Sequence, residues 1–474
     1  MTKPTAIELT PSQSDVAQAM IDFCRDSTKS SQAMATLSGY AGVGKTTVVA
    51  HVVDALSQVS SEFMSIVVLA PTHKALSVLS EKLGDSAVAT QTLQAALALK
   101  VKDMPDGQQE TEDTGEPGSL RDYTLAIIDE ASMVSAAMFA TALFKRGRCK
   151  LLFVGDPAQL PPVDQQRGTG SDRSQMGLQL SPAFGPEVPV HWKLTEVVRQ
   201  AQDNPIIRLA TAARQCIDEG REFTLQTMRQ QLRDGDEDFL AMQPGGVVEV
   251  ARLVADAISH GQDTRALALD NNTVQAVNAH VHAMVHPGQG DYPSGTMLMA
   301  QDGFSGWDPE SIGSSKWIKV QVRNSALLRV AECSDERHPS ESGRPSYKLT
   351  LVADGGERIA CWVVVDQRQW QADISEHFAD YRQLKTREKL SGGSEARALK
   401  EQAREASAGG WALKARYAPL RYAYAMTVHK SQGSTFDAVV LAWDSFQKSR
   451  DVQVRNRLAY VALTRTRKFA VVCA

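Results

Sequence analysis

The stretch Gly39-Tyr40-Ala41-Gly42-Val43-Gly44-Lys45-Thr46-Thr47 decides the fold of this chain. It fits the phosphate-binding pattern G-x-x-x-x-G-K-[ST], in which backbone N–H groups curl around phosphate oxygens. A short apolar run at 34–37 precedes it, and apolar residues at helical spacing follow it as far as Leu56. The loop therefore joins a buried strand to a helix whose N-terminus favours anions. This context predicts that Lys45 reaches the outer phosphates of a nucleotide and that Thr46 places its hydroxyl on Mg²⁺.

The composition is that of a soluble globular chain. Its 474 residues suggest roughly two to four domains. Hydrophobic residues make up 43% and charged residues 22% of the sequence. The net charge of −4 excludes a global basic field, so any binding of nucleic acid must come from a local channel.

The cysteines and the N-terminal sequence indicate a reducing compartment. The six cysteines are scattered without a C-x-x-C pair, which argues against a disulfide framework and against a zinc site. No basic region followed by an apolar run opens the chain, and no apolar run reaches membrane-spanning length. We therefore expect a cytoplasmic protein, in a bacterial cell or a phage-infected host, that has no contact with a membrane.

Strands alternate with helices, which predicts an α/β fold with parallel sheets. Buried apolar runs at 65–70, 125–128 and 150–155 belong to a first α/β unit, and the run at 266–269 opens a second. Helical patterning dominates 205–260. The α/β pattern resumes at Tyr422, with strands expected at 438–442 and 469–473.

Three segments depart from this pattern. Residues 100–122 are rich in Gly, Pro and acidic side chains, which indicates an exposed, mobile insertion. From 296 to 366 the apolar period becomes two, which predicts an antiparallel β insertion. Residues 369–408 are polar and helix-prone, as in a solvated helical projection.

Polar side chains follow the strands at 125–128 and 150–155. Asp129 can hold the Mg²⁺ shell, and Glu130 can take a proton from the attacking water. Gln159 can sense the γ-phosphate, because its amide both donates and accepts. Alone, these residues would be two exposed acids and a residue of a Pro-rich turn. The phosphate loop upstream favours the functional interpretation.

Two arginines are candidates for stabilising transition-state charge. An arginine placed against the γ-phosphate from another domain would also report closure of the interface. Arg199 and Arg465 have suitable sequence contexts. The alternative for each is a solvent-facing side chain, the usual state of arginine.

The ordered set of motifs resembles that of superfamily 1 helicases, and is most similar to their Dda/RecD-like branch. The phosphate loop alone is shared by many folds, but the set is specific to the superfamily and covers nearly the whole chain. The matching segments are LTPSQ at 9–13, GYAGVGKTT at 39–47, APTHKA at 70–75, IIDEASM at 127–133, GDPAQLPPV at 155–163, LTEVVR at 194–199, TVHKSQG at 427–433 and YVALTRTR at 460–467.

The resemblance implies ATP and Mg²⁺ as cofactors, with Gln13 on the adenine. Nucleotide contacts would come from Gln13, Gly39, Ala41, Gly42, Val43, Gly44, Lys45, Thr46, Thr47 and Gly433. The metal would be held by Thr46 and Asp129, and the catalytic set would be Lys45, Glu130, Gln159, Arg199 and Arg465. DNA contacts would come from Thr72, His73, Lys74, Thr92, Pro162, Thr427, His429 and Lys430, which suit gripping phosphates without reading bases.

The resemblance also implies a division into domains. The first RecA-like domain, which binds ATP, would comprise 1–83 and 118–193, with a small inserted pin or wedge region at 84–117. The second RecA-like domain would comprise 194–290 and 420–474. Residues 291–419 would form an inserted SH3-like β domain with a helical tower.

The sequence departs from the family pattern in the inserted region. The family often has Thr-Ile-His where this chain has Thr90-Gln91-Thr92-Leu93. Its β-hairpin wedge would fall at 102–116, where this chain has no aromatic residue and poor strand propensity. This acidic segment is either a wedge that repels and splays the displaced strand or a flexible surface loop.

The implied function is an ATP-dependent DNA helicase and single-stranded DNA translocase moving 5′-to-3′ in replication, recombination or repair. Its partners would be single-stranded DNA, forked duplex DNA and a single-strand-binding or replication protein, and it would act as a monomer. The alternative is an ATP-regulated single-strand-binding clamp or remodeller with little unwinding. His282 and His286 share a helical face that can bind zinc, but without an acidic partner we expect a surface helix.

Overall fold

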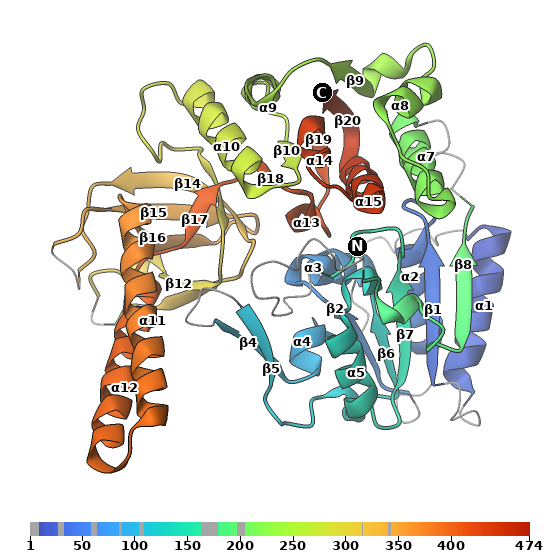
Figure 1. Cartoon of the computed structure of the whole chain (residues 1–474). Helices are drawn as coiled ribbons and strands as arrows, with labels where there is room; N and C mark the ends of the chain where they lie inside the picture. The colour runs from blue at the N-terminus through green and yellow to red at the C-terminus, as the bar shows by residue number, and fades with distance from the viewer. Residues whose placement is uncertain are drawn as a thin grey trace.

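The computed structural model describes residues 9–26, 33–57, 64–84, 88–103, 109–162, 179–196, 204–314, 316–339 and 343–474. Two parallel sheets with helices around them stand one above the other, and an antiparallel sheet with a long helical pair lies beside them (Figure 1). The expected α/β fold with a β insertion and a helical projection is therefore confirmed. No helix in these described ranges is both long and apolar enough to cross a membrane.

The first sheet has the strand order β3-β2-β6-β7-β1-β8, with every pair parallel. Its strands are buried on both faces: Leu125 and Ile127 of β6 pack in one apolar cluster, and Ala126 and Ile128 pack in another. Since successive side chains of a strand point to opposite faces, a continuous apolar run suits this position. The elements are α1 (Pro11–Arg25), β1 (Met34–Gly39), α2 (Lys45–Ser57), β2 (Ile66–Ala70), α3 (His73–Leu83), β3 (Ala89–Thr92), α4 (Leu93–Ala96), η1 (Leu120–Asp122), β6 (Leu125–Ile128), η2 (Ala131–Met133), α5 (Ala136–Lys145), β7 (Lys150–Gly155), η3 (Pro182–Phe184) and β8 (Val190–Leu194).

The second sheet has the strand order β18-β10-β19-β20-β9 and is also parallel throughout. Strand β9 interrupts the segment 205–260, where the sequence predicts helices. This strand was missed because a four-residue edge strand has too few residues to show a periodicity. The elements are α7 (Pro205–Glu219), α8 (Leu225–Gln231), η4 (Asp236–Asp238), β9 (Leu240–Gln243), α9 (Val247–Ser259), β10 (Thr264–Ala268), α10 (Asn271–Val285), β18 (Ala425–Thr427), α13 (Val428–Ser431), β19 (Phe436–Ala442), α14 (Trp443–Phe446), α15 (Val452–Leu463) and β20 (Thr466–Cys473).

The antiparallel sheet has the strand order β13-β12-β16-β15-β14-β11-β17. The helices α11 and α12 pack along each other and project from it (Figure 1), and buried Trp362, Trp370 and Tyr417 join their base to the sheet. The elements are β11 (Met297–Ala300), β12 (Phe304–Trp307), η5 (Pro309–Ser311), β13 (Lys319–Val322), β14 (Leu327–Ser334), β15 (Ser346–Ala353), β16 (Arg358–Val364), α11 (Gln367–Leu390), α12 (Gly393–Arg416) and β17 (Leu420–Tyr422).

Two strands fall on the other side of an expected domain boundary. Strand β3 lies within the expected insertion at 84–117, but it pairs with β2 and forms an edge of the first parallel sheet. Strand β17 lies after the expected boundary at 420, but it pairs with β11 in the antiparallel sheet. Strands of three or four residues carry little sequence signal, so their partners decide where they belong.

The segment expected to be a mobile insertion contains a β-hairpin. Strand β4 (Leu99–Asp103) pairs antiparallel with β5 (Gln109–Asp113), and Leu99 lies opposite Asp113. Residues 104–108 lie outside the described residues. The hairpin stands apart from the six-stranded sheet (Figure 1). The prediction of a patternless segment was therefore wrong for these two strands.

A buried lysine of α5 fixes the base of this hairpin. Lys145 is only 3% exposed, and its ammonium group donates to the carboxylate of Asp113. It also donates to the carbonyl oxygens of Leu97, at 2.9 Å, and of Glu116, at 2.8 Å. All three donors of the ammonium group are thus used on the last residue of the hairpin and on two residues that flank it.

Candidate functional site

The phosphate loop spans the turn between β1 and α2, as the sequence predicts. Gly42 and Gly44 have φ angles of +79° and +81°, in the left-handed region that favours glycine. A Cβ on Gly44 would lie 2.5 Å from the Nε2 atom of Gln13, so a larger residue would have to displace the Gln13 amide from the loop. The loop holds a backbone conformation that points successive N–H groups toward an anion.

Lys45 lies over its own loop. Its Nζ atom donates to the carbonyl oxygens of Gly39 and Tyr40, each at 2.9 Å. An ammonium group has three donors, so one remains for a phosphate oxygen. The predicted phosphate-binding role of Lys45 fits this position at the start of α2.

Gln13 fastens the start of α1 to the phosphate loop. Its Oε1 atom accepts from the N–H of Thr10 at 3.0 Å, within a capping box. Its Nε2 atom donates to the carbonyl oxygen of Val43 at 2.9 Å. One N–H of the amide is left for a base, and the expected adenine contact stays a prediction.

The two carboxylates after β6 have an unusual backbone. Glu130 has a φ angle of +51°, a conformation that non-glycine residues adopt at a cost and that is concentrated at functional sites. Its N–H donates to the Oδ1 atom of Asp129 at 2.9 Å. Burial and the charge of Glu130 raise the pKa of Asp129 above its ordinary value. A buried acid with this shift is one whose charged form a bound cation would stabilise.

Thr46 and Asp129 fit a magnesium site. Thr46 lies in the first turn of α2, beside Lys45. Within the described ranges no three His, Cys, Asp or Glu side chains cluster as a complete metal site. Mg²⁺ is usually bound through one or two carboxylates together with substrate phosphates, so a full protein cage is not required.

Gln159 presents a buried acceptor without a partner. The residue is 7% exposed, and its Oε1 atom has no hydrogen bond among the described residues. An unpaired buried acceptor is costly, so it is a suitable partner for a group that enters the site. This supports the prediction that Gln159 faces the reacting phosphate.

Arg465 is buried, so the solvent-facing alternative was wrong for this residue. Its guanidinium donates to the carbonyl oxygens of Val461 and Ser434 and to the hydroxyl of Thr464, at 3.1, 3.4 and 2.9 Å. Burial lowers the pKa of Arg465, and the charge of Glu130 opposes that shift. The charge of Glu130 in the first domain therefore acts on Arg465 in the second. Arg199 lies outside the described residues.

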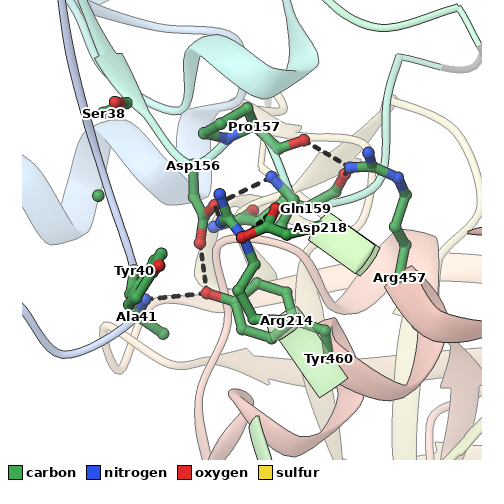
Figure 2. A network of polar contacts seen from close by, with 12 residues as sticks. Ser38, Tyr40, Ala41, Asp156, Pro157, Gln159, Arg214, Asp218, Arg457 and Tyr460 are labelled. Atoms are coloured by element: carbon green, nitrogen blue, oxygen red, sulfur yellow. Dashed lines mark hydrogen bonds and ion pairs between the residues drawn. The ribbon is translucent and has the colours of Figure 1, made fainter. Parts of the chain in front are cut away.

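A polar network joins the phosphate loop to the second sheet (Figure 2). The carboxylate of Asp156, at the end of β7, accepts from Arg214 of α7 and from the hydroxyl of Tyr460 of α15. The Tyr460 hydroxyl in turn accepts from the N–H of Ala41 at 2.9 Å. The loop that begins at Asp156 is therefore clamped between the two parallel sheets.

Arg457 extends this clamp. Its guanidinium donates to the carbonyl oxygens of Pro157 and Gln159, the latter at 3.0 Å (Figure 2). Sequence reasoning missed Arg214, Arg457 and Tyr460 as site residues. Tyr460 lies inside the YVALTRTR segment, and Arg457 lies one helical turn before it, so this segment carried a signal. Arg214 had none, because its partner is far away in the sequence.

The expected DNA contacts of the first sheet lie at strand ends. The Thr72 hydroxyl caps α3 by accepting from the N–H of Ala75 at 3.2 Å, so its own hydrogen stays available to a phosphate. Thr92 caps α4 in the same way but is only 9% exposed. Burial lowers the pKa of Lys74, whose ammonium lies 5.7 Å from the ring centre of Phe436 in the second sheet.

Two further side chains complete the first-sheet group. Burial and the charge of Arg323 lower the pKa of His73. Pro162 ends the described part of the loop that begins at Asp156. The expected DNA contacts of both remain predictions.

The expected DNA contacts of the second sheet lie at the end of β18. Thr427 caps α13, and the Nζ atom of Lys430 donates to the Oε1 atom of Gln301 at 2.9 Å. Both residues line a cavity of 920 Å³ between this sheet and the antiparallel sheet, with Arg368 and Arg421 also on its wall. Burial lowers the pKa of Lys430, and Arg421 adds to the shift. The cavity thus has polar and cationic groups from both sheets.

The two remaining expected site residues of this region are His429 and Gly433. Burial lowers the pKa of His429, which favours a neutral ring. A Cβ on Gly433 would lie 3.6 Å from the nitrogen of Ala75, so the contact found at this glycine is with α3. Its expected nucleotide contact stays a prediction.

His282 is not on a helix surface, contrary to the sequence-based expectation. It is 9% exposed, and its ring stacks on Tyr422 with centroids 4.3 Å apart. Its Nε2 atom lies 2.9 Å from the carbonyl oxygen of Gly290. The residue packs between α10 and the antiparallel sheet, because Tyr422 belongs to β17.

Comparison with known proteins identifies similar sequences along the chain. A family described as "AAA domain" matches residues 9–237, and a family described as "UvrD-like helicase C-terminal domain" matches residues 422–473. The ATP-dependent DNA helicase dda of Enterobacteria phage T4 is 23% identical over 457 residues, which cover 91% of this chain and 92% of that protein. The ATP-dependent RecD2 DNA helicase of Deinococcus radiodurans is 29% identical over 260 residues, 54% of this chain and 31% of that protein.

Similar solved structures cover almost all of the chain. A Pif1 helicase from Bacteroides, in complex with ADP-AlF3 and ssDNA, is 16% identical, with a TM-score of 0.48 over 98% of this chain and 92% of its own. A Pif1 helicase from Candida albicans is 17% identical, with a TM-score of 0.45 over 99% of this chain and 94% of its own.

Proposed function

We infer that this chain, which belongs to the Dda/RecD-like branch of superfamily 1 helicases, is an ATP-dependent DNA helicase that moves along single-stranded DNA. The observation that carries this proposal is the clamp on the loop that begins at Asp156. This loop carries Gln159, which we expect to contact the nucleotide, and Pro162, which we expect to contact the DNA. Side chains from helices of the second domain form hydrogen bonds to the same loop. A change in the bound nucleotide therefore changes the position of the residues that contact the DNA.

The catalytic residues have complementary roles in hydrolysis. Glu130 takes the proton from the attacking water, and it follows β6 in a left-handed backbone conformation. Lys45 and Arg465 stabilise the charge that develops on the phosphate, one from each sheet. When bound through Thr46 and Asp129, Mg²⁺ neutralises phosphate charge.

The loop between Asp156 and Pro162 couples the two ligands. Gln432, next to the α13 helix that Thr427 caps, donates from Nε2 to the carbonyl oxygen of Leu160 at 3.2 Å. The same loop therefore carries an expected nucleotide contact and bonds to a residue next to the expected DNA contacts of α13. Closing the two RecA-like domains on ATP moves α13 relative to α3, and each cycle shifts the grip along the DNA.

The hairpin β4–β5 is the proposed wedge. A wedge must resist the end of a duplex, and the three bonds of Lys145 at the hairpin base supply stiffness. We propose 5′-to-3′ movement, which is supported by the resemblance to the Dda/RecD-like branch. The substrate we propose is a fork with a single-stranded tail, and the nucleotide is ATP with Mg²⁺.

Several finer features belong to the same proposal. We propose an intracellular monomer that works with a single-strand-binding or replication protein. We also propose that the ATP-binding domain includes β3 and that the SH3-like domain includes β17, since both strands pair with those sheets. The pin then consists of the hairpin and its flanks.

Steady-state ATP hydrolysis with and without single-stranded DNA tests the proposal. A motor hydrolyses ATP many times faster when it has a strand to move on. An ATP-regulated clamp would bind the strand but show little DNA-stimulated turnover. RNA of the same sequence is the matched control for the choice of DNA, since no reader of a 2′-hydroxyl is recognisable in the sequence.

A further inference from the structure

The Tyr460 hydroxyl accepts a hydrogen bond from a backbone N–H group of the phosphate loop. It accepts from the N–H of Ala41 at 2.9 Å, although Tyr460 belongs to α15 and Ala41 to the turn after β1 (Figure 2). Tyr460 is only 1% exposed. In a phosphate loop, the backbone N–H groups are the donors that bind phosphate oxygens. A side chain of the second sheet therefore uses a bond that a nucleotide can also use.

The direction of the bonds at Tyr460 is fixed by Asp156. Burial and the charge of Asp156 raise the pKa of Tyr460 well above its ordinary value, so the phenol keeps its proton. That proton is donated to the Oδ2 atom of Asp156. Since the hydroxyl has one hydrogen, its contact with Ala41 is made through an oxygen lone pair.

Asp156 is itself held on its other oxygen. Its Oδ1 atom accepts from Arg214 and from the N–H of Ala158, the latter at 2.9 Å. Asp156 is fully buried, and Asp218 also pairs with Arg214 at 3.3 Å. The carboxylate has little freedom to move, so it fixes the place of the Tyr460 hydroxyl.

Two arginines, one on α15 and one just after it, also form hydrogen bonds around this helix. Arg457 holds the carbonyl oxygens of Pro157 and Gln159 from one turn before Tyr460. Arg465 follows the C-terminus of α15, and its Nε atom donates to the carbonyl oxygen of Val461 on that helix. A shift of α15 at Tyr460 would therefore also change the hydrogen bonds of Arg457 and Arg465.

We propose that the Tyr460 hydroxyl and a nucleotide phosphate compete for the N–H of Ala41, and that this exchange couples phosphate binding to the position of α15. The proposal rests on the proposed function, because it takes the phosphate loop as the nucleotide site. One N–H group makes one strong hydrogen bond, and a charged phosphate oxygen is a stronger acceptor than a phenol. The phosphate displaces the hydroxyl, and Tyr460 keeps only its bond to Asp156. Tyr460 is thus a positioning residue, and it has no part in the chemical step.

The variant Tyr460→Phe tests the competition directly. It removes the competing acceptor, so ADP should bind more tightly, on the order of fivefold, as for the loss of one neutral hydrogen bond. It also leaves a buried oxygen of Asp156 without its donor, so the thermal unfolding temperature should fall. Titration with a fluorescent ADP derivative, without DNA, measures the first effect. A merely supporting tyrosine would give weaker binding together with lower stability, and unchanged or weaker ADP binding would overturn the proposal.

Two companion variants keep the test decisive. Tyr424→Phe removes the hydroxyl of another buried tyrosine of the second sheet and should leave ADP affinity unchanged. If Tyr460→Phe does not fold, a fluorinated tyrosine placed only at position 460 keeps the shape and the donor but weakens the acceptor. It should tighten ADP binding by a smaller factor, and no tightening would overturn the proposal.

This measurement is independent of strand separation. If the wild-type protein failed to unwind DNA, the proposed function would be lost while the ADP titrations still decided the exchange at Ala41. If it unwound DNA but Tyr460→Phe did not tighten ADP binding, only the present inference would fail.

Discussion

The proposed nucleotide-binding face and the β4–β5 hairpin are held in opposite ways. On the nucleotide face, comprising Lys45, Glu130, Gln159 and Arg465, the side chains come from both parallel sheets and are buried or half-buried. The hairpin belongs to one domain, and Lys145 and Thr114 both form hydrogen bonds at its base. The proposed chemistry therefore depends on how two domains meet, whereas the proposed wedge depends on hydrogen bonds within one domain.

The two regions should therefore fail separately. A change on the nucleotide face removes the energy source, so hydrolysis and unwinding are lost together. A change in the hairpin leaves hydrolysis intact and removes strand separation alone.

Lys45→Ala should lower ATP hydrolysis by about a thousandfold, because it removes a cation that stabilises the transferring phosphate. The residue lies outside both core clusters of the first sheet, so the protein should still fold, but the loss of its bonds to the carbonyl oxygens of Gly39 and Tyr40 should lower the unfolding temperature slightly. Lys468→Ala, which removes an exposed lysine paired with Asp437, is the matched control. Turnover above a few per cent of wild type in a folded Lys45→Ala protein would contradict the assignment.

Glu130→Gln should slow hydrolysis between about a hundredfold and a thousandfold, because an amide cannot accept the proton of the attacking water. Nucleotide affinity should change little, since the shape and the left-handed backbone are kept. Single-turnover hydrolysis and equilibrium ATP binding separate the two quantities. An equal loss in both would make Glu130 a structural or metal-binding residue instead.

Arg465→Ala should reduce DNA-stimulated ATP turnover by about a hundredfold, somewhat less than an arginine finger usually contributes. The guanidinium reaches the nucleotide only when the second sheet closes on the first, so the DNA-stimulated rate should suffer more than the basal rate. Arg455→Ala, on the helix α15 that precedes Arg465 and paired with Glu222, is the control. A wild-type DNA-stimulated rate would remove Arg465 from the site.

Shortening the hairpin should remove most duplex unwinding and leave DNA-stimulated hydrolysis nearly unchanged. Replacing 102–110 with Asn-Gly keeps the pairs Leu99–Asp113 and Val101–Thr111 and closes them with a favoured two-residue turn. The anchor on Lys145 is also kept. Unwinding at the wild-type rate would show that strands are separated elsewhere on the molecule.

Lys145→Met should have the smallest effect, a partial loss of unwinding. It leaves the carbonyl oxygens of Leu97 and Glu116 without their donor, at a cost on the order of 2 kcal/mol. Urea unfolding measures the stability, and the ratio of unwinding to hydrolysis measures the wedge. If that ratio stayed at the wild-type value while the protein lost stability, the stiffness of the hairpin base would have no role in strand separation.

The sequence predicted those parts of the site whose chemistry is fixed by residue type at a strand end. The phosphate loop, Asp129 and Glu130 lie at the turns where the apolar runs end, since parallel strands place their carboxyl ends at one edge. Burial of Arg465 could not be predicted, because it depends on the carbonyl groups of Val461 and Ser434. For the same reason, the contact between Tyr460 and Ala41 appears only when the domains are assembled.

Short strands account for most of the errors in the fold. Strands β3 and β17 have three or four residues, so pairing with β2 and β11 decides their place. The hairpin was missed because its acidic composition opposes strand formation, while the register of β4 on β5 and the anchor on Lys145 favour it. Both contributions depend on residues outside a local window of sequence.

Strand displacement from a tailed duplex tests the central claim most directly. The wild-type protein should release the strand from a duplex with a 5′ single-stranded tail when ATP and Mg²⁺ are present. It should not do so with a non-hydrolysable ATP analogue or with a 3′ tail alone. Release with a 3′ tail instead would reverse the proposed polarity. The absence of release from either tail, with ATP hydrolysis still stimulated by single-stranded DNA, would contradict the account of this protein as a helicase.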